Sequence, residues 1–184
     1  MIFHETSLPG SYILELEKVV DERGFFARTW CREDLEAHHL DGSLAQCSLS
    51  FNHKKGTLRG MHFQLPPYDE TKLVWCTKGA IFDVIIDLRA QSSTYMKWMG
   101  VELSGDNRKM LYIPKGFAHG FQTLVDDSEV FYFISGPFHQ EAARGVAWND
   151  PAFHIIWPES NNRVISNKDK NWPMFVLDQP PWFL

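Results

Sequence analysis

The stretch Pro114-Lys115-Gly116-Phe117-Ala118-His119-Gly120 decides how the rest of the chain is interpreted. It combines a proline and glycines, which favour turns, with two apolar residues and one imidazole. Similar short apolar runs lie on both sides of it, with glycines and prolines between them. Because no helical pattern separates these runs, the sequence predicts an all-β sandwich or barrel rather than parallel strand and helix units.

The bulk composition is that of one globular domain over residues 1–184. Aromatic residues make up 14% of the chain, and they favour strands and line ligand cavities. The formal net charge of -5 argues against nucleic acid or an anionic membrane as a partner. A small anionic substrate is compatible with this charge where arginines and lysines gather at one site.

Three cysteines, Cys31, Cys47 and Cys76, have an odd count and no metal-type spacing. We expect them to be free and mostly buried thiols in a reducing compartment. Residues 1–10 lack the basic start and apolar core of a signal peptide, and no apolar run approaches membrane-spanning length. We therefore expect a cytoplasmic protein.

The expected elements are mostly short strands, at residues 12–20, 57–64, 72–77, 80–88, 98–103, 109–113 and 129–135. Residues 21–24 predict a turn, and residues 154–157 predict a last strand. A helix is expected over 29–40, with Thr29 as its cap. The apolar, proline-rich tail at 178–184 is expected to pack on the body or on a second subunit.

The P-x-G-x-x-H pattern of Pro114, Gly116 and His119 resembles the second motif of cupin barrels, whose histidine is a ligand in the metal-binding members. The first cupin motif supplies H-x-H, but the matching place here reads His62-Phe63-Gln64. An amide is a weak, neutral ligand for a divalent metal. We therefore expect a metal-free cupin or jelly-roll barrel with short flanking helices. In it, His119 is either a structural imidazole or a cavity residue.

His62 is the candidate base. Alternation along a strand places it on the same face as Leu58, Gly60 and Gln64. An imidazole inside a barrel needs a partner, and a carboxylate on its far nitrogen would fix the tautomer and raise its basicity. The residues alone do not name that carboxylate, and a satisfied core histidine is the simpler interpretation.

Two further polar side chains lie in apolar strands. Asp83 shares a face with Asp87 and needs a compensating partner, which in the simpler interpretation is a structural ion pair with Arg89 or another basic residue. Tyr132 lies on the opposite face from its aromatic neighbour Phe133. A buried phenol needs a hydrogen-bond partner or serves as a general acid, and both interpretations stay open here.

Lys72 and Arg59 are the candidate anion contacts. Strict alternation puts Arg59 on the face opposite His62, whereas a bulge at Gly60 would turn both inward. Spacing does not decide between these arrangements. A solvated surface charge is the simpler interpretation of both cations, and it is the favoured one for Lys72.

Together these residues resemble the dTDP-4-dehydrorhamnose 3,5-epimerase family over about residues 21–169. The resemblance depends on the order and spacing of several motifs, none of which is sufficient alone. These are Arg23-Gly24-Phe25-Phe26, Leu58-Arg59-Gly60-Met61-His62-Phe63-Gln64, Lys72-Leu73-Val74, Gly79 with Phe82-Asp83-Val84, Asp87-Leu88-Arg89, Pro114 through Phe121, Trp148-Asn149-Asp150-Pro151 and Ser166-Asn167-Lys168-Asp169.

The resemblance implies a catalytic role for each of four residues. His62 resembles the base, with Asp169 as the carboxylate that orients it, and Tyr132 resembles the acid on the other face of the sugar. Lys72 resembles the residue that stabilises an enolate oxygen. The chemistry suits these types, because inversion next to a ketone needs a base and an acid on opposite faces and positive charge at the enolate. It requires no metal, nicotinamide or other cofactor.

The substrate-binding residues follow from the same resemblance. Arg59 looks like a contact to the diphosphate, and Arg23 like one supplied by the neighbouring subunit of a homodimer. Gln46, Asp83 and His119 resemble cavity residues that position the sugar. Phe26, which belongs to the first of these motifs, is included among the binding residues.

Several nucleotide-reading positions depart from the family pattern. Arg28 replaces a glutamate, and a guanidinium, which only donates, suits an acceptor such as the ring nitrogen of cytosine. Ser48 replaces an asparagine, and Phe133 a lysine. Pro137-Phe138 stands where the family has two tyrosines, although Phe138 can still stack on a base. We expect a dTDP-linked 4-keto-6-deoxyhexose as substrate, with a CDP-linked sugar as the main alternative.

The residues also leave the reaction itself open. Epimerisation at C3, C5 or both is consistent with them. A sugar 3,4-ketoisomerase uses a similar barrel and similar enolate chemistry but moves the carbonyl. A non-catalytic binding cupin would bind ligand without proton exchange, and a metal-dependent oxygenase is disfavoured by Gln64.

Overall fold

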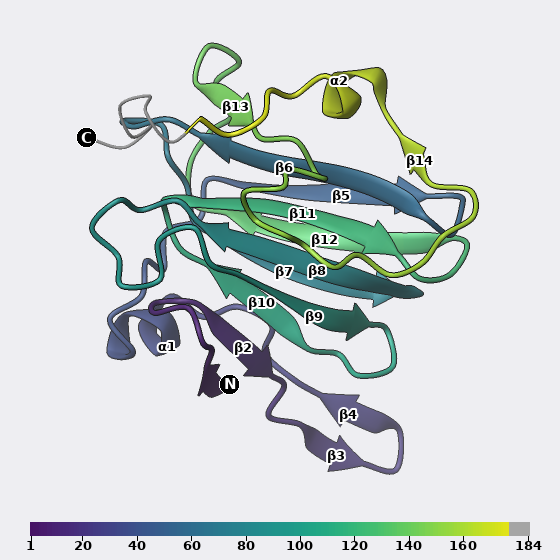
Figure 1. Ribbon diagram of the computed structural model, residues 1–184. Helices are drawn as coiled ribbons and strands as arrows, with labels where there is room; N and C mark the ends of the chain where they lie inside the picture. The colour runs from purple at the N-terminus through teal and green to yellow at the C-terminus, as the bar shows by residue number, and fades with distance from the viewer. Residues whose placement is uncertain (177–184) are drawn as a thin grey trace.

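Two facing β-sheets form the body of the protein (Figure 1). The computed structural model describes residues 1–176. The first sheet has the order β1 (Ile2–Glu5), β2 (Tyr12–Glu15), β10 (Met110–Ile113), β7 (Lys72–Lys78), β12 (Ser128–Ile134) and β5 (Gln46–Asn52). The second has the order β13 (Ala143–Gly145), β6 (Thr57–Gln64), β11 (Phe117–Thr123), β8 (Ala80–Asp87) and β9 (Trp98–Ser104), and β14 (Val164–Ile165) pairs with β6.

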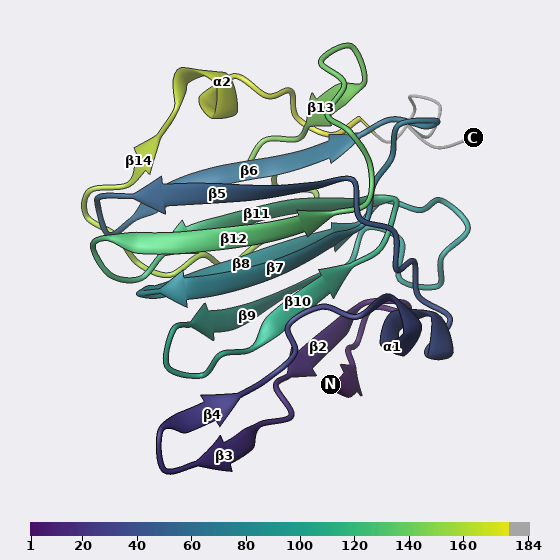
Figure 2. The same ribbon diagram turned by 180° about the vertical axis from the view of Figure 1, so that it is seen from behind.

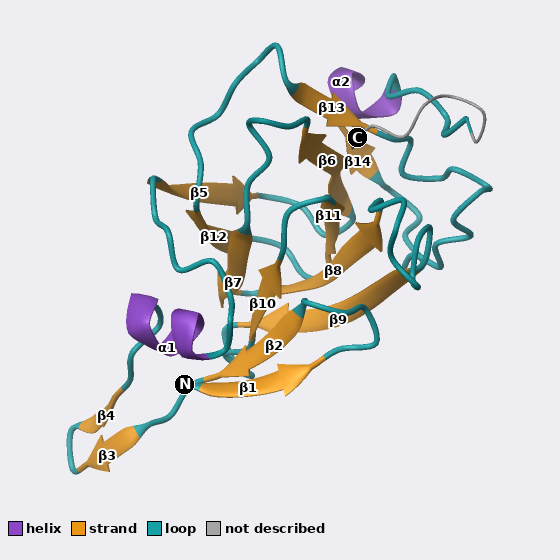
Figure 3. Ribbon diagram, turned by 90° about the vertical axis from the view of Figure 1, so that its left-hand side faces the viewer, coloured by secondary structure: helices purple, strands orange, loops and turns teal. Residues whose placement is uncertain are grey.

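The two sheets face each other across the core, as the end-on view in Figure 3 shows. The strands within each sheet pair antiparallel, except that β14 runs parallel to β6. Val74 and Val130 of the first sheet pack in one buried cluster with Ile85 and Phe121 of the second. This arrangement is the barrel that the sequence predicts, and it places the inner faces of β6, β11, β7 and β12 around a shared interior.

Strand β8 is buried along almost its whole length, which explains why its sequence is nearly continuously apolar. On its inner side, Ile85 belongs to the core between the sheets. On its outer side, Val84 and Ile86 pack with Phe153 and with the partly buried Phe175 from the C-terminal segment. This segment crosses the outside of the second sheet and carries the short helix α2 (Asn167–Lys170) to the edge near β6 and β13 (Figure 1).

A separate hairpin of β3 (Val19–Asp21) and β4 (Gly24–Phe26) extends away from both sheets (Figure 2). The turn expected at residues 21–24 is confirmed. The hairpin carries apolar side chains that are largely uncovered by the described residues, since Val20 and Phe26 are each 73% exposed. Such exposure of large apolar residues on a projecting element is typical of an interface.

Several boundaries differ from the expected ones. The strand expected at 12–20 is two strands, because residues 16–18 are unpaired between β2 and β3. The helix expected over 29–40 is α1 (Arg32–Ala37), and its N-cap is Cys31 in an extended conformation rather than Thr29. Residues 154–157 form no strand. The tail at 178–184 lies outside the described residues.

The strands β1, β5 and β11 were not expected from the sequence. The expectation of mostly buried cysteines is wrong, because Cys47 is exposed and only Cys76 is fully buried. Burial raises the pKa of the Cys76 thiol to about 11. Across residues 1–176, none of the helices has the length and apolar character needed to cross a membrane.

Candidate active site

A cavity of about 340 Å³ opens between the two sheets. Its walls come from β5, β7 and β12 of the first sheet and from β6, β11 and β13 of the second, with α2 at its edge. A volume of this size suits a small-molecule site. The predicted site residues that line it are Gln46, Ser48, Arg59, His62, Lys72, His119, Tyr132 and Phe138.

His62 on β6 is paired with Asp169 on α2, with 2.6 Å between Nε2 and Oδ1. Ser166 caps α2 by accepting a hydrogen bond from the Asp169 N–H, which holds the carboxylate beside β6. The Trp172 indole N–H donates to Asp169 Oδ1, and the Gly60 N–H donates to Oδ2. Burial alone would raise the pKa of Asp169, but the hydrogen bond from His62 and these other donors keep it below its usual value.

The tautomer of His62 follows from this pairing. An ionised carboxylate only accepts hydrogen bonds, so in a neutral imidazole Nε2 carries the proton and Nδ1 keeps its lone pair. Asp169 is buried, whereas the His62 side chain is 40% exposed and lines the cavity. The pair therefore holds an unprotonated ring nitrogen available for a substrate.

A bulge at Gly60 turns both Arg59 and His62 into the cavity. Pairing with β11 shifts register here, because His62 lies opposite His119 but Arg59 lies opposite Phe121. Gly60 has a φ of +120°, and a Cβ there would lie 2.6 Å from the Gly120 Cα, so only glycine fits. The arrangement with both side chains inward is thus the observed one.

Arg59 is held at the cavity by a second residue. Its Nε donates to Asn52 Oδ1 at 2.8 Å, and Asn52 is itself buried at the end of β5. The other guanidinium nitrogens make no hydrogen bond within residues 1–176, and a guanidinium is well suited to bind an anion. Arg59 is therefore an exposed cation that Asn52 positions at the cavity.

Tyr132 approaches the cavity from the sheet opposite His62. It lies on β12, where it pairs with Ser48 of β5 and Val74 of β7. Its ring makes an edge contact with His119, with centroids 6.2 Å apart. Burial, with Asp83 nearby, raises the pKa of the phenol, so it stays protonated and can donate a proton.

His119 and Asp83 form a second, more deeply buried pair, with 2.7 Å between Nε2 and Oδ1. The second carboxylate oxygen of Asp83 is buried and has no hydrogen-bond partner among the described residues. Burial raises the pKa of Asp83, while the hydrogen bond from His119 opposes this shift. Asp83 thus lies behind the cavity wall, and its hydrogen bond holds in place His119, which lines the cavity.

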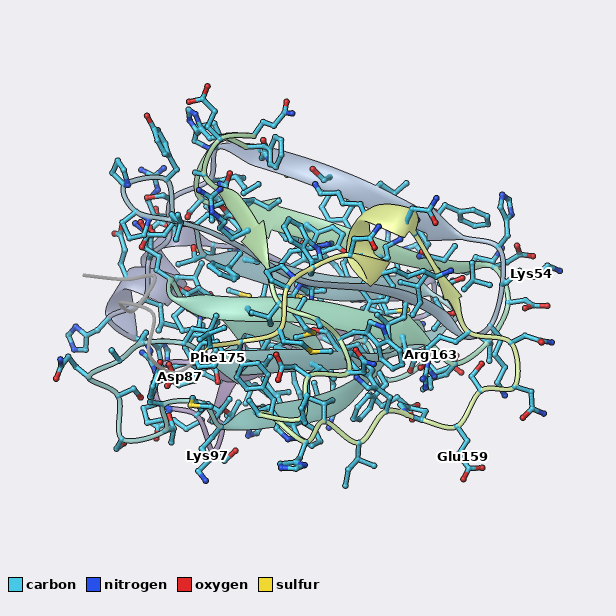
Figure 4. All side chains as sticks on the ribbon, turned by 45° about the horizontal axis from the view of Figure 1, so that its top comes forward. Lys54, Asp87, Lys97, Glu159, Arg163 and Phe175 are labelled. Carbon is cyan, nitrogen blue, oxygen red and sulfur yellow. The ribbon has the colours of Figure 1, made fainter. Side chains whose placement is uncertain are left out.

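Arg89, considered as a partner for Asp83, instead pairs with Asp87 at 2.8 Å. Asp87, labelled in Figure 4, also accepts hydrogen bonds from the hydroxyls of Ser92 and Thr94. Burial favours a higher pKa for Asp87, but these donors hold it below its usual value. Asp87 pairs with Arg89, as the simpler structural interpretation expects, whereas Asp83 pairs with His119, which lines the cavity.

Lys72 lies at the start of β7 with its side chain only 15% exposed, so the solvated-surface interpretation is wrong for this residue. Its ammonium is 3.2 Å from Glu70 Oε1. Gln64, at the position of a metal ligand in metal-binding cupins, has its amide occupied by hydrogen bonds to protein groups, including Glu70. Within residues 1–176, no three His, Cys, Asp or Glu side chains are grouped to hold a metal ion.

Besides Asp83, three predicted binding residues do not line the cavity of their own chain. Arg23 is 84% exposed at the tip of the β3–β4 hairpin and pairs with Asp21. Phe26 lies on the same hairpin, and Arg28 follows it, 4.0 Å from Asp34. Both guanidiniums are exposed, because the β3–β4 hairpin and the residues after it lie away from the cavity of their own chain.

Among the cavity residues that were not predicted as site residues, four stand out. Lys168 and Trp172 enter with α2, Arg144 enters with β13, and Glu70 lies just before β7. Lys168 directly precedes Asp169 in the same sequence motif, and this position could have indicated that Lys168 lies at the site. No pattern marked Arg144 or Trp172, because neither lies in a predicted strand.

The geometry provides an acid and a base on opposing walls of one cavity. His62 comes from the second sheet and Tyr132 from the first, so a ring bound between them is contacted on both faces. Lys72 adds positive charge beside them. This arrangement can remove a weakly acidic C–H proton on one face, stabilise the resulting oxyanion and return a proton on the other face.

Comparison with known proteins agrees with this chemistry. A family model described as dTDP-4-dehydrorhamnose 3,5-epimerase matches residues 5–176. The dTDP-4-dehydrorhamnose 3,5-epimerase of Sinorhizobium fredii is 40% identical over 173 residues, which cover 94% of this chain and 89% of that protein. The dTDP-4-dehydrorhamnose 3,5-epimerase of Escherichia coli is 41% identical over 177 residues, which cover 95% and 93% of the two proteins.

Solved structures give the same result. The crystal structure of dTDP-4-dehydrorhamnose 3,5-epimerase from Bacillus anthracis, with TDP and PPi bound, has a TM-score of 0.90 and 39% identity, covering 95% of this chain and 99% of that one. The dTDP-6-deoxy-D-glucose-3,5-epimerase of Legionella pneumophila, in complex with dTDP-4-keto-L-rhamnose, has a TM-score of 0.90 and 33% identity, covering 97% and 94%.

Proposed function

The chain belongs to the dTDP-4-dehydrorhamnose 3,5-epimerase family, and on this premise we propose that His62 and Tyr132 move the protons of its reaction. It is an isomerase that epimerises dTDP-4-keto-6-deoxyglucose at C3 and C5 to give dTDP-4-dehydrorhamnose. The observation that carries the proposed mechanism is that these two residues line one cavity from opposite sheets.

The proposed reaction at each carbon has two steps. His62 Nδ1 takes the proton next to the C4 ketone, and the electrons of that C–H bond form an enolate on the C4 oxygen. The Lys72 ammonium stabilises the negative oxygen. Tyr132 then donates its phenolic proton to the opposite face of the carbon, which inverts the centre. Exchange with solvent afterwards removes the added proton from His62 and returns a proton to the Tyr132 phenolate.

Asp169 makes the first step easier in this proposal. It holds His62 in the tautomer whose Nδ1 is free, and it stabilises the imidazolium that forms when His62 gains a proton. His119, held by Asp83, lies beside Tyr132 and is proposed to position the sugar. Gln46 and Ser48 line the same wall on β5 and are proposed to share this role.

The nucleotide is thymidine diphosphate, since the chain binds dTDP-linked sugars. We propose that Arg59 contacts the diphosphate and that Phe138, which is exposed at the cavity, stacks on the base. The CDP alternative depended on Arg28, which in its own chain lies 4.0 Å from Asp34 and gives no support for a contact to cytosine. Contacts to the diphosphate bind the substrate away from the reacting carbons.

We propose that the protein works as a homodimer with one domain over 1–184 in each cytoplasmic subunit. The β3–β4 hairpin exposes Val20 and Phe26, and the edge strand β5 exposes Leu49 and Phe51. Apolar surface of this kind is buried between subunits in obligate dimers. In this arrangement the hairpin carries Arg23 and Phe26 to the cavity of the neighbouring subunit.

Product analysis tests the proposed function. The purified protein is incubated with dTDP-4-keto-6-deoxyglucose, and the sugar is followed by NMR. The expected product has inverted C3 and C5 and keeps its carbonyl at C4. A carbonyl at C3 would indicate a 3,4-ketoisomerase, inversion at one carbon a single epimerase, and an unchanged sugar that still binds would indicate a non-catalytic cupin.

A further inference from the structure

We propose that Glu70, fixed by Gln64, is a positioning residue that sets where the Lys72 ammonium lies in the cavity. This inference depends on the role proposed for Lys72 in the epimerase reaction. Glu70 itself does not have to touch the reacting atoms. It acts through Lys72, whose long side chain has several rotatable bonds and needs an external constraint to hold one position.

The first support is the burial of the pair. The Lys72 Nζ lies 3.2 Å from Glu70 Oε1, and the two side chains are 15% and 8% exposed. At such low exposure an ion pair is constrained and poorly screened by solvent. Removal of one partner leaves the other charge unpaired in the cavity wall, so the remaining side chain would shift to a different position.

The second support is the way in which Gln64 holds Glu70. The Gln64 Nε2 donates to Glu70 Oε2 and also to the backbone oxygen of Tyr68 at 2.9 Å. Its Oε1 accepts from the His139 N–H at 2.7 Å. The Glu70 carboxylate is thus bound on one oxygen by Gln64 and on the other by Lys72, which fixes both its place and its orientation.

The same amide ties Lys72 to the segment that carries Phe138. Gln64 contacts both neighbours of Phe138 in sequence, because its Nε2 donates to the Pro137 backbone oxygen at 3.2 Å and its Oε1 accepts from the His139 N–H. The Tyr68 and His139 rings stack with centroids 3.8 Å apart, which closes the network. One polar network therefore connects the proposed base-stacking residue with the residue proposed to stabilise the enolate.

A double-mutant cycle tests the inference. The variants Glu70→Ala, Lys72→Ala and the double variant are measured for kcat, for KM and for affinity toward dTDP alone. Asp69→Ala, which removes the adjacent carboxylate that does not line the cavity, is the matched control. Glu70→Gln keeps the size of the side chain and replaces the alanine variant if that variant does not fold.

We expect Glu70→Ala to lower kcat about tenfold to a hundredfold, as for a misplaced catalytic group, with unchanged affinity for dTDP. In the Lys72→Ala background, Glu70→Ala should alter kcat by less than about twofold, because each substitution removes the same Glu70–Lys72 interaction. Glu70→Gln should lower kcat in the same direction, since its amide brings donors to the Gln64 Nε2. Asp69→Ala should behave like the unmodified protein.

Two results would overturn the inference. An unchanged kcat in Glu70→Ala, or in Glu70→Gln where the alanine variant does not fold, removes the positioning role. Losses that add in the double variant show that Glu70 acts independently of Lys72. If Lys72→Ala alone has no effect on kcat, the role of Lys72 in the proposed function is wrong as well, so the two failures are distinguishable.

Discussion

The imidazole of His62 and the carboxylate of Asp169 are 107 residues apart in sequence and 2.6 Å apart in space. The pair joins β6 to α2, and it sets the His62 tautomer because Asp169 only accepts. Asp169→Asn replaces this acceptor with an amide that can donate, which favours the wrong tautomer. We expect kcat to fall by roughly 10²–10⁴ without loss of affinity for dTDP. Steady-state kinetics and dTDP binding measure both quantities, and an unchanged kcat would contradict the role of Asp169.

Tyr132→Phe removes the proposed acid and leaves His62 in place. The phenylalanine fills the same space, so the fold and the affinity for dTDP should be kept. We expect product formation to fall sharply while solvent deuterium still enters the sugar, because His62 can return a proton to the face from which it took one. NMR of the sugar in heavy water separates exchange from inversion. Loss of both would show that Tyr132 is needed before the enolate forms.

Mixing of two inactive variants tests the homodimer with exchanged hairpins. Arg23→Ala damages the contact proposed for the neighbouring cavity, and His62→Ala damages the cavity of its own subunit. Heterodimers of the two have one intact site, so random mixing should restore about a quarter of the normal activity. The activity is measured after the chains have been unfolded and refolded together. Activity that stays at the level of the separate variants would place Arg23 outside the neighbouring site.

Asp87 gives a prediction about stability that is independent of catalysis. Its pKa is held below the usual value by Arg89, Ser92 and Thr94, so its contribution to stability is present above about pH 3.9 and is lost as the pH falls through its lowered pKa. We expect Asp87→Asn to lower the free energy of unfolding by about 2–3 kcal/mol at pH 7. The difference from the unmodified protein should shrink in acid.

Denaturant unfolding at several pH values measures this difference, and kcat is the control. Because Asp87 does not line the cavity, the variant should keep its normal kcat while it remains folded. A stability difference that persists unchanged at the lowest pH would show that the charge of Asp87 is not the source of the effect.

Much of the barrel could be predicted because its strands have strong local patterns. Ala80–Asp87 is a nearly continuous apolar run and Thr57–Gln64 is a short segment between turn residues, and the bounds of both were predicted to within one residue. The strand Phe117–Thr123 was missed because buried His119, Gln122 and Thr123 interrupt its apolar pattern. Their hydrogen-bond partners lie elsewhere in the chain, and local sequence does not reveal them.

The site residues also divide into those that local sequence indicates and those that depend on contacts distant in sequence. His62 and Tyr132 were recognised as candidates because each is a polar group in an apolar strand. The inward direction of Arg59 depends on the bulge at Gly60, which alternation alone leaves undecided. Glu70 was missed because its importance comes from two contacts across the cavity wall, with Gln64 and Lys72.

Deuterium exchange tests the central claim, proton transfer by His62, most directly. The protein is incubated with dTDP-4-keto-6-deoxyglucose in heavy water, and C3 and C5 are followed by NMR beside a His62→Ala variant that still binds dTDP. We predict deuterium at both carbons with the unmodified protein and none above the uncatalysed background with the variant. Exchange that persists in the variant would contradict the assignment of His62 as the base.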